Sequence, residues 1–514
     1  MSAPPTVPPP APALEEMRSL LRTMSAALQT YRLYPPGHPN RTDAVRAMSE
    51  HARGMLQRAG EPPVLFVTRH SFYLGPTLLS RESLALGKLI ESFERAGVEA
   101  VEFLSGAVDF DIDALAGILV GERPFEPELP GIALNRVRPV LDQVEEDTRE
   151  LSELLRSYSI GLEVLRDTAA RVAAGQAVDL AGARRVIERL ATQVARDPSH
   201  ALLVTAVKSY DEYTYYHMMN VCILSLALGH AIGLRQDQVA TLGLGALLHD
   251  VGKVRVPRDI LQHVGALSEE QWRIVQRHPL DGAAMLLLTG KEMFNPAVTI
   301  VFEHHAAYDL SGYPTLTGRT RPSLGARMVA VADCFDAVTS KRSYRKPEDR
   351  RQALSILQAG AAKGFDPVVV RSFVRLLGLF PIGSMVLLST GEVGMVVRNH
   401  ARLLSRPVVR LVLDRTGAPC DPVEVDLSEQ AMGGGYRWSV ERSMDPQELG
   451  VDMLSLVMSG QVEQSAPDPG QAGLVHEPSH GEPRPAGYVD AHLEDGGPSE
   501  QVRIDPDVSA PFPR

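Results

Sequence analysis

Histidine and aspartate stand side by side in one part of this chain, and both residue types can bind metal ions. His249 and Asp250 directly follow an apolar run that ends at Leu248. A buried carboxylate is costly unless it is hydrogen-bonded, paired with a cation or bound to a metal. Asp250 therefore needs partners. Separate and mostly apolar segments of the chain offer several candidates: His217, His278, the adjacent pair His304 and His305, and Asp333.

These five histidines and two aspartates predict a metal centre rather than a set of core residues. A single histidine in an apolar helix is more often a satisfied core residue, but here each belongs to a local motif. Imidazole combined with carboxylate suits iron, manganese or zinc better than magnesium or calcium. Two metal ions bridged by one carboxylate can lower the pKa of a water and neutralise the charge of a phosphodiester. Such a bridge is a reason for Asp250 to stand next to His249.

The elements that must position these residues are predicted to be helices, so the expected fold class is mainly α. Residues 199–378 are almost wholly helical in pattern and hold the entire set, which predicts an all-helical domain. Residues 14–130 predict a small α/β domain with a regulatory role, and residues 131–198 predict a helical connector. After the helical domain, residues 379–460 change to short alternating segments, which predict a small antiparallel β domain.

Composition and charge exclude several classes of function. The chain has 514 residues and a net charge of -11 at pH 7, which argues against binding to polymeric nucleic acid. Its three cysteines are far apart and are interpreted as reduced thiols. No apolar run is long enough to span a bilayer, and no signal-peptide pattern is present, so we expect a cytoplasmic protein. Residues 1–13 and 461–514 lack apolar periodicity and are predicted to be disordered tails.

The connector leaves two interpretations open. Leucine, valine and isoleucine recur at helical spacing between interleaved charges, but the repeat is not a clean heptad. The segment is either a packed link between domains or the seam of a homodimer.

Short motifs follow one another in a defined order between residues 213 and 345. They are Tyr213-Thr214-x-x-His217, His249-Asp250-Val251-Gly252-Lys253, His278-Pro279-x-x-Gly282, His304-His305, Gly312-Tyr313-Pro314, Val331-Ala332-Asp333 and Thr339-Ser340-x-Arg342-x-x-Arg345. In this order they resemble the HD-GYP phosphodiesterases, a bacterial branch of the HD metal-dependent phosphohydrolases. The resemblance to the helical domain with its β domain covers about residues 199–427.

The resemblance implies two divalent metal ions, most commonly iron or manganese. It places the ligands in two groups that share Asp250: His217, His249 and Asp333 in one, and His278, His304 and His305 in the other. The substrate that the resemblance implies is cyclic di-GMP, opened to linear pGpG and often cleaved further to GMP. Some members of the family act on mixed cyclic dinucleotides instead.

Further residues are candidates for catalysis and substrate binding, beside Asp250 itself. Lys253 is expected one helical turn beyond His249 on the same face, where it would stabilise transition-state charge. Gly312-Tyr313-Pro314 predicts a turn that faces the ligand. Arg342 and Arg345 are three residues apart and could hold a phosphate together. A surface lysine, a plain turn and a solvated basic face are the simpler alternatives for these features.

Three positions depart from the family pattern. Ala306 stands where glutamate is common, and Leu310 stands where glycine commonly follows aspartate. Tyr213 stands where some members carry a glutamate ligand for a third metal, so we expect two metals. The main alternative function is a catalytically weak or inactive member that binds metal or cyclic dinucleotide as a sensor or scaffold. The complete ligand set favours catalysis, and the turn at Gly312 with the two arginines disfavours a hydrolase of ordinary nucleotides.

Overall fold

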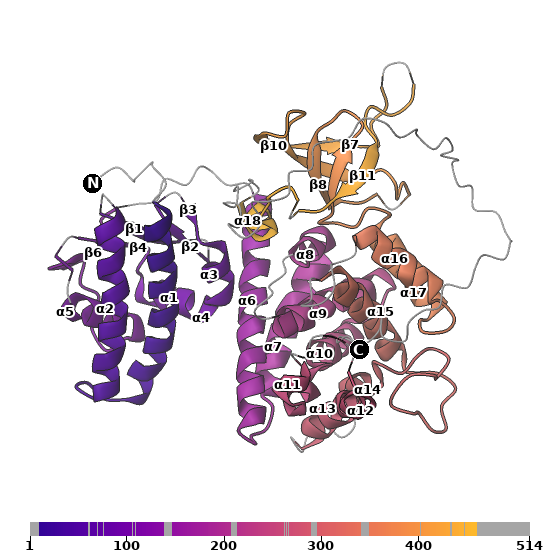
Figure 1. The fold of residues 1–514 in the computed structure, drawn as a ribbon, viewed down its shortest axis with the longest axis horizontal. Helices are drawn as coiled ribbons and strands as arrows, with labels where there is room; N and C mark the ends of the chain where they lie inside the picture. The colour runs from indigo at the N-terminus through magenta and orange to yellow at the C-terminus, as the bar shows by residue number, and fades with distance from the viewer. Residues whose placement is uncertain are drawn as a thin grey trace.

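A computed structural model shows four successive parts: an N-terminal α/β unit, a long helix, a helical domain and a β domain (Figure 1). The mainly helical fold class is therefore confirmed. The structure describes residues 10–59, 62–68, 70–75, 77–104, 106–107, 109–137, 146–206, 213–261, 263, 265, 267–288, 296–340, 349–400, 402–431, 434–446 and 448–459. Most of the two predicted tails lies outside these residues. Among the described helices, none is both long and apolar enough to cross a membrane.

The N-terminal unit is an antiparallel sheet with helices packed on one face (Figure 1). Its elements are α1 (Ala11–Leu33), α2 (Pro39–Ala59), β1 (Val64–Thr68), β2 (Ser71–Leu74), β3 (Thr77–Leu78), α3 (Ser80–Ala85), α4 (Gly87–Ala96), β4 (Ala100–Phe103), α5 (Asp109–Val120), β5 (Glu128–Leu129) and β6 (Ile132–Leu134). The strand order is β3-β2-β1-β4-β6-β5. Alternate residues of β1, such as Leu65 and Val67, face the helices and join their apolar core.

The long helix α6 (Glu146–Ala173) stands between the N-terminal unit and the helical domain (Figure 1). Leu154, Tyr158 and Leu162 are buried along one face of α6 and belong to the core of the helical domain. On another side, α6 contacts α3 and α4 of the N-terminal unit. The helix therefore touches both parts of the molecule, which makes it the structural link between them.

The helical domain continues with α7 (Leu180–Arg196), α8 (Pro198–Val204), α9 (Tyr213–Ala231), α10 (Gln236–Leu248), the short 3-10 helix η1 (Val251–Arg255), α11 (Arg258–Leu261), α12 (Glu269–Val275), α13 (His278–Leu287), α14 (Pro296–Glu303), α15 (Leu324–Thr339), α16 (Arg350–Ala359) and α17 (Pro367–Leu377). Side-chain caps begin several of these helices. Ser268, for example, forms a capping box with Gln271 at α12. Helix α9 packs against α10 and α15 and is buried on nearly all sides, because its residues from Tyr216 to Gly229 are apolar or small with few exceptions. Helices α9 and α15 carry the candidate ligands His217 and Asp333, and α10 ends directly before His249.

The C-terminal part confirms the predicted antiparallel β domain. Its strands are β7 (Met385–Leu388), β8 (Val393–Arg398), β9 (Val408–Leu413), β10 (Pro419–Asp426) and β11 (Val440–Met444), in the order β10-β9-β8-β7-β11. The chain then forms the short helix α18 (Met453–Ser459), which contacts α3 of the N-terminal unit. Two segments that are far apart in the sequence, α3 and α18, thus lie together beside α6 (Figure 1).

Candidate metal centre

The end of helix α10 delivers His249 and Asp250 into the interior. The helix ends at Leu248, and Asp250 adopts φ -98° and ψ 6° before the 3-10 helix η1 begins. The sequence predicted Lys253 one helical turn beyond His249. In the structure Lys253 lies in η1 instead, because the backbone changes from an α-helix to a 3-10 helix at Asp250. The tighter turn brings Nζ of Lys253 onto Oδ2 of Asp250 as a buried ion pair.

A glycine allows η1 to approach the next ligand closely. An added Cβ at Gly252 would lie 2.0 Å from the carbonyl oxygen of His278 and 2.6 Å from the backbone nitrogen of Gly282. No side chain fits in this space, so only glycine permits η1 to pack against the beginning of α13. The motif glycine therefore sets the distance between Asp250 and His278.

The seven candidate ligands come together in two adjacent buried groups. Ligand atoms within each group all lie within 4.8 Å of one another, and the groups are Asp250 with His278, His304 and His305, and His217 with His249 and Asp333. Carboxylate oxygens of Asp250 lie 4.0 Å from Nε2 of His217 and 3.3 Å from Nε2 of His278. Asp250 thus stands between the two groups, in the place that a bridging ligand would need.

Backbone carbonyl groups fix which nitrogen of three imidazoles carries the proton. Nδ1 of His249 lies 2.7 Å from the carbonyl oxygen of Ala246, and His278 and His304 have the same contact at 2.8 and 2.7 Å with the carbonyl three residues earlier. Nδ1 must donate in each case, so a neutral ring presents a lone pair on Nε2. All three Nε2 atoms face the centre of the site.

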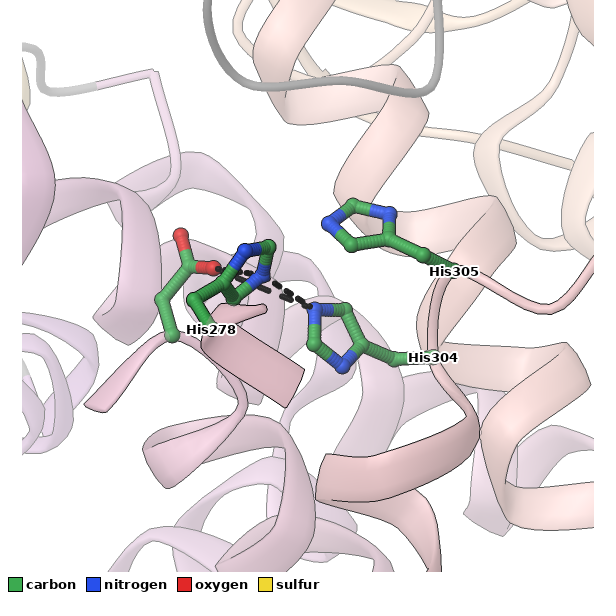
Figure 2. Close-up of side chains that lie close together, drawn as sticks. His278, His304 and His305 are labelled. Carbon is green, nitrogen blue, oxygen red and sulfur yellow. Dashed lines mark hydrogen bonds and ion pairs between the residues drawn. The ribbon is translucent and has the colours of Figure 1, made fainter. Parts of the chain in front are cut away.

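The resulting geometry fits a metal ion. Nε2 of His278 and Nε2 of His304 lie 3.2 Å apart and, as neutral rings, oppose two lone pairs (Figure 2). Such a contact is repulsive unless a cation or a proton lies between the nitrogens. Nε2 of His305 is buried and makes no hydrogen bond with any described residue, although buried polar atoms are nearly always satisfied. A metal ion would satisfy all three nitrogens.

Charge and burial keep most of these groups in the form that binds metal. Burial lowers the pKa of His278 and holds the pKa values of His304 and His305 well below their ordinary value. Burial alone would raise the pKa of Asp250, but the charge of the neighbouring Lys253 holds it well below its ordinary value. Neutral imidazoles and an ionised carboxylate are the ligating species.

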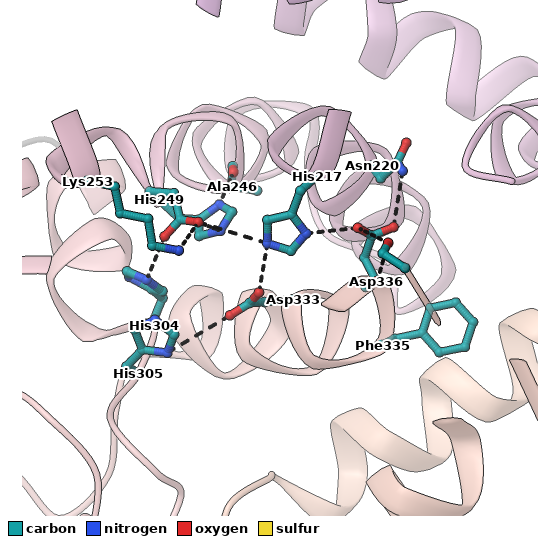
Figure 3. Close-up of polar contacts among 12 residues, drawn as sticks. His217, Asn220, Ala246, His249, Lys253, His304, His305, Asp333, Phe335 and Asp336 are labelled. Carbon is teal, nitrogen blue, oxygen red and sulfur yellow. Dashed lines mark hydrogen bonds and ion pairs between the residues drawn. The ribbon is translucent and has the colours of Figure 1, made fainter. Parts of the chain in front are cut away.

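His217 is oriented by a chain of buried polar residues. Its Nδ1 lies 2.8 Å from Oδ2 of Asp336, while its Nε2 lies 3.0 Å from Oδ1 of Asp333. Burial lowers the pKa of His217, but hydrogen bonds to the two carboxylates outweigh this effect and raise it. Asn220 donates to Oδ1 of Asp336 at 3.1 Å (Figure 3). It also accepts a hydrogen bond from the hydroxyl of Tyr158 at 2.9 Å. A carboxylate behind a ligating imidazole is typical of metal sites.

The sequence analysis did not identify the hydrogen-bonded residues that support His217, which are Asp336, Asn220 and Tyr158. Asp336 follows Asp333 by three residues in α15, so both carboxylates lie on one face of that helix. This spacing was a signal that could have identified Asp336. The roles of Asn220 and Tyr158 had no comparable signal, because α6 and α9 are distant in the sequence and meet only in the folded chain.

The turn at Gly312 packs directly against the ligand loop. An added Cβ at Gly312 would lie 2.2 Å from the carbonyl oxygen of His305, and the backbone nitrogen of Tyr313 donates to that oxygen at 3.1 Å. The Tyr313 ring lies 4.8 Å from the ring of His305 and makes an edge contact with Trp272, a residue not predicted from the sequence. Pro314 follows in the same turn. Arg342 and Arg345, the predicted phosphate contacts, lie outside the described residues.

The three departures from the family pattern have distinct surroundings. Ala306 is buried, and its backbone nitrogen donates to the carbonyl oxygen of Glu303 at 2.8 Å. Leu310 adopts φ 69°, in the left-handed region where glycine is favoured. Tyr213 stacks on the ring of His217, with centroids 5.4 Å apart. Aromatic stacking thus occurs at the position where the family resemblance led us to look for a third metal ligand.

Fold and site together define a helical histidine–aspartate metal-site domain. Comparison with known proteins agrees, because residues 201–369 match the family model described as HD domain, and residues 385–432 match a KOW domain associated with HD domain. The chain is 36% identical over 291 residues to a cyclic di-GMP phosphodiesterase of Pseudomonas aeruginosa, covering 56% of this chain and 69% of that protein. The chain belongs to the HD-GYP family.

Two further relatives share mainly the helical domain. A 3'3'-cGAMP-specific phosphodiesterase of Vibrio cholerae is 35% identical over 33% of this chain and 32% of its own length. A cyclic di-GMP phosphodiesterase response regulator of Xanthomonas campestris is 33% identical over 34% of this chain and 46% of its own length. Of these three relatives, the Pseudomonas aeruginosa protein is the one whose similarity extends well beyond the helical domain.

Proposed function

We propose that this protein is a metal-dependent phosphodiesterase that hydrolyses cyclic di-GMP to linear pGpG, GMP or both. The observation that carries the proposal is the complete pair of ligand groups on either side of Asp250. Support comes from relatives whose names state activity on cyclic di-GMP or 3'3'-cGAMP. A related cyclic dinucleotide is therefore the second candidate substrate.

The proposed metal ligands follow the two groups of the site. One divalent ion would be held by His217, His249 and Asp333, the other by His278, His304 and His305, and Asp250 would contact both. Iron or manganese suits this mixture of imidazole and carboxylate. When bound, such ions lower the pKa of a water and neutralise charge on the phosphate oxygens.

The protein's own residues would position and neutralise the substrate. Lys253 is buried beside Asp250, so its ammonium group can stabilise negative charge that develops on a phosphate oxygen. Tyr313 and Trp272 form an aromatic edge above the ligand loop, against which a guanine base can stack. Gly312 lets the backbone approach closely, and Arg342 and Arg345 are proposed to hold the second phosphate.

The test is hydrolysis of cyclic di-GMP by protein purified anaerobically and loaded with iron(II) or manganese(II). Metal content is determined on the same sample, and the linear and mononucleotide products are separated chromatographically. Asp250→Ala, which removes the shared carboxylate, should abolish turnover and leave a folded protein. Turnover by Asp250→Ala at the parent rate would overturn the proposed site.

The alternative is a member that binds metal or cyclic dinucleotide without turning it over. Ala306 and the strained Leu310 are the observations that favour it. Full metal loading without hydrolysis of cyclic di-GMP or mixed cyclic dinucleotides would establish this alternative. Restoration of activity by Ala306→Glu or Leu310→Gly would then identify the residue responsible.

A further inference from the structure

A cavity of about 770 Å³ lies between the N-terminal unit, the long helix α6 and the helical domain. Helices of the N-terminal unit, α6, α9 and the C-terminal helix α18 line the cavity. The lining residues include Gln29 of α1, Arg81 of α3, Lys88 of α4, Glu163 of α6, Tyr216 of α9 and Leu454 of α18. Its volume lies within the range of pockets for small ligands, about 300–1,000 Å³. The cavity is separate from the candidate metal centre, although Tyr216 is the residue before His217.

Two buried carboxylates line this cavity, and one oxygen of each has no hydrogen-bond donor among the described residues. Glu82 is 4% exposed and Glu163 is 8% exposed, and Oε2 of each is buried without a hydrogen bond to any described residue. Nε of Arg18 is 3.6 Å and Nη1 of Arg22 is 3.9 Å from carboxylate oxygens of Glu82, and Nζ of Lys88 is 3.4 Å from Oε2 of Glu163. Oε1 of Glu163 accepts a hydrogen bond from the backbone nitrogen of Lys88 at 2.7 Å. Burial raises the pKa values of both carboxyl groups despite these cations. N–H donors from a ligand would satisfy both oxygens.

Two arginines that line the cavity supply positive charge that no ion pair with a described residue neutralises. Arg32 and Arg81 line the cavity, and neither makes an ion pair with a described carboxylate. Within the described part of the chain, the guanidinium group of Arg32 donates one hydrogen bond, to the hydroxyl of Ser92 at 3.4 Å. Two such guanidinium groups in a chain of net charge -11 favour binding of an anionic group, and arginine matches the geometry of phosphate.

We propose that this cavity binds a guanine nucleotide, which acts as a regulatory ligand distinct from the substrate in the metal centre. The arginines Arg32 and Arg81 hold the phosphate, and the carboxylates Glu82 and Glu163 accept hydrogen bonds from the base. Guanine presents two neighbouring N–H donors, N1–H and the 2-amino group, on one edge. Adenine places a ring acceptor beside its amino group, so it would leave a carboxylate facing a lone pair.

A ligand in this cavity could influence the metal centre through a series of hydrogen-bonded residues that begins on α6. Glu163 and Tyr158 are on the same helix, α6, five residues apart. Tyr158 bonds to Asn220, Asn220 bonds to Asp336, and Asp336 bonds to the candidate ligand His217. A ligand that fixes α6 against the N-terminal unit would therefore bias the orientation of His217. Signal and substrate would share the guanine chemistry but occupy different places in the fold.

Binding is tested on the full-length chain carrying Asp250→Ala, so that turnover cannot consume or release nucleotide. GMP, AMP and inorganic phosphate are titrated calorimetrically, and amide hydrogen exchange locates the bound GMP. We expect GMP to protect amides of residues 80–92 and 163–170 and to bind at least about tenfold more tightly than AMP or phosphate, as two satisfied charged hydrogen bonds would produce.

Variants assign the binding to the cavity. Glu163→Gln preserves shape but loses the carboxylate, and Arg81→Ala alters an exposed side chain, so both should remain folded. Each should weaken GMP binding by about tenfold or more. Arg95→Ala, at an exposed position of α4 outside the cavity, should bind GMP like the parent. The proposal is overturned if GMP protects neither segment, if both cavity variants bind normally, or if AMP or phosphate binds as tightly as GMP.

Discussion

Nδ1 of His217 and Oδ2 of Asp336 lie 2.8 Å apart in the buried interior, on helices α9 and α15. The carboxylate fixes the ring so that Nε2 points toward Asp333 and the centre of the site. Asp336 is itself held by Asn220, so the ring has little rotational freedom. The orientation of this candidate ligand is therefore set by residues that are not themselves ligands.

Replacing Asp336 by asparagine should weaken metal binding by about 10–100-fold. The amide keeps the size of the side chain but removes the negative charge behind the His217 ring. Metal affinity can be measured by competition with a chromogenic chelator. Asp421→Asn, at an exposed position in β10, is the matched control and should bind metal like the parent. Unchanged affinity in Asp336→Asn would show that the pair only packs the core.

Replacing Lys253 by methionine should lower kcat by about 10²–10³ while changing KM much less, because the ammonium group stabilises charge in the transition state. The measurement is steady-state hydrolysis of cyclic di-GMP at fixed metal content. Lys363→Met changes an exposed lysine and should leave both constants at parental values. A rise in KM with unaltered kcat would assign Lys253 to ground-state binding only.

The Leu310→Gly variant should be more stable to unfolding than the Leu310→Ala variant. The φ of 69° at Leu310 is strained for any residue with a Cβ, by about 1–2 kcal/mol, whereas the extra freedom of glycine in the unfolded chain offsets about 0.5–1 kcal/mol of this. We expect the free energy of unfolding of Leu310→Gly to exceed that of Leu310→Ala by about 0.5–1 kcal/mol. Denaturant titration of both variants measures the difference. Equal stability would argue against strain at this turn.

Asp197 should stabilise the beginning of α8 in a pH-dependent way. Its carboxylate accepts hydrogen bonds from Ser199 and His200, and the side chain of His200 is the main cause that lowers the pKa of Asp197 to about 2. Asp197→Ala should cost about 1 kcal/mol near neutral pH. Because the folded-state pKa is below the unfolded value, the contribution is present above the ordinary pKa of 3.8 and is lost as pH falls toward 2.

The control for Asp197 is a serine. Asp197→Ser keeps a capping oxygen that does not titrate, so its stability relative to Asp197→Ala should not vary with pH. Denaturant melts at several pH values between 2 and 7 measure both differences. A constant difference between the parent and Asp197→Ala across this range would contradict the role of the carboxylate charge.

Removing metal should destabilise the helical domain. A ligand that binds only the folded state adds about 2.7 kcal/mol at a concentration one hundred times its Kd. Treatment with a chelator should therefore lower the melting temperature, and manganese(II) should restore it in a concentration-dependent manner. Asp250→Ala should respond much less to both additions. The same melting temperature before and after chelation of metal-loaded protein would contradict a buried metal site.

The sequence by itself determined which segments form helices or strands and which residues could bind metal. Apolar periodicity is a property of short stretches of sequence, so it predicted a helical domain followed by an antiparallel β domain. Ligand types are also local, because imidazole and carboxylate groups bring their chemistry wherever they are placed. The motif order could therefore indicate the family before any contact was known.

Only the tertiary structure determined which of those segments contact one another and how their side chains meet. The place of Asp250 between the two ligand groups depends on the change of helix type after Leu248 and on the close approach at Gly252, and both arise from packing. The support of His217 by Asp336, Asn220 and Tyr158, and the cavity beside α6, combine residues far apart in the chain. Such contacts are set by how whole helices pack together, and no local pattern encodes that arrangement.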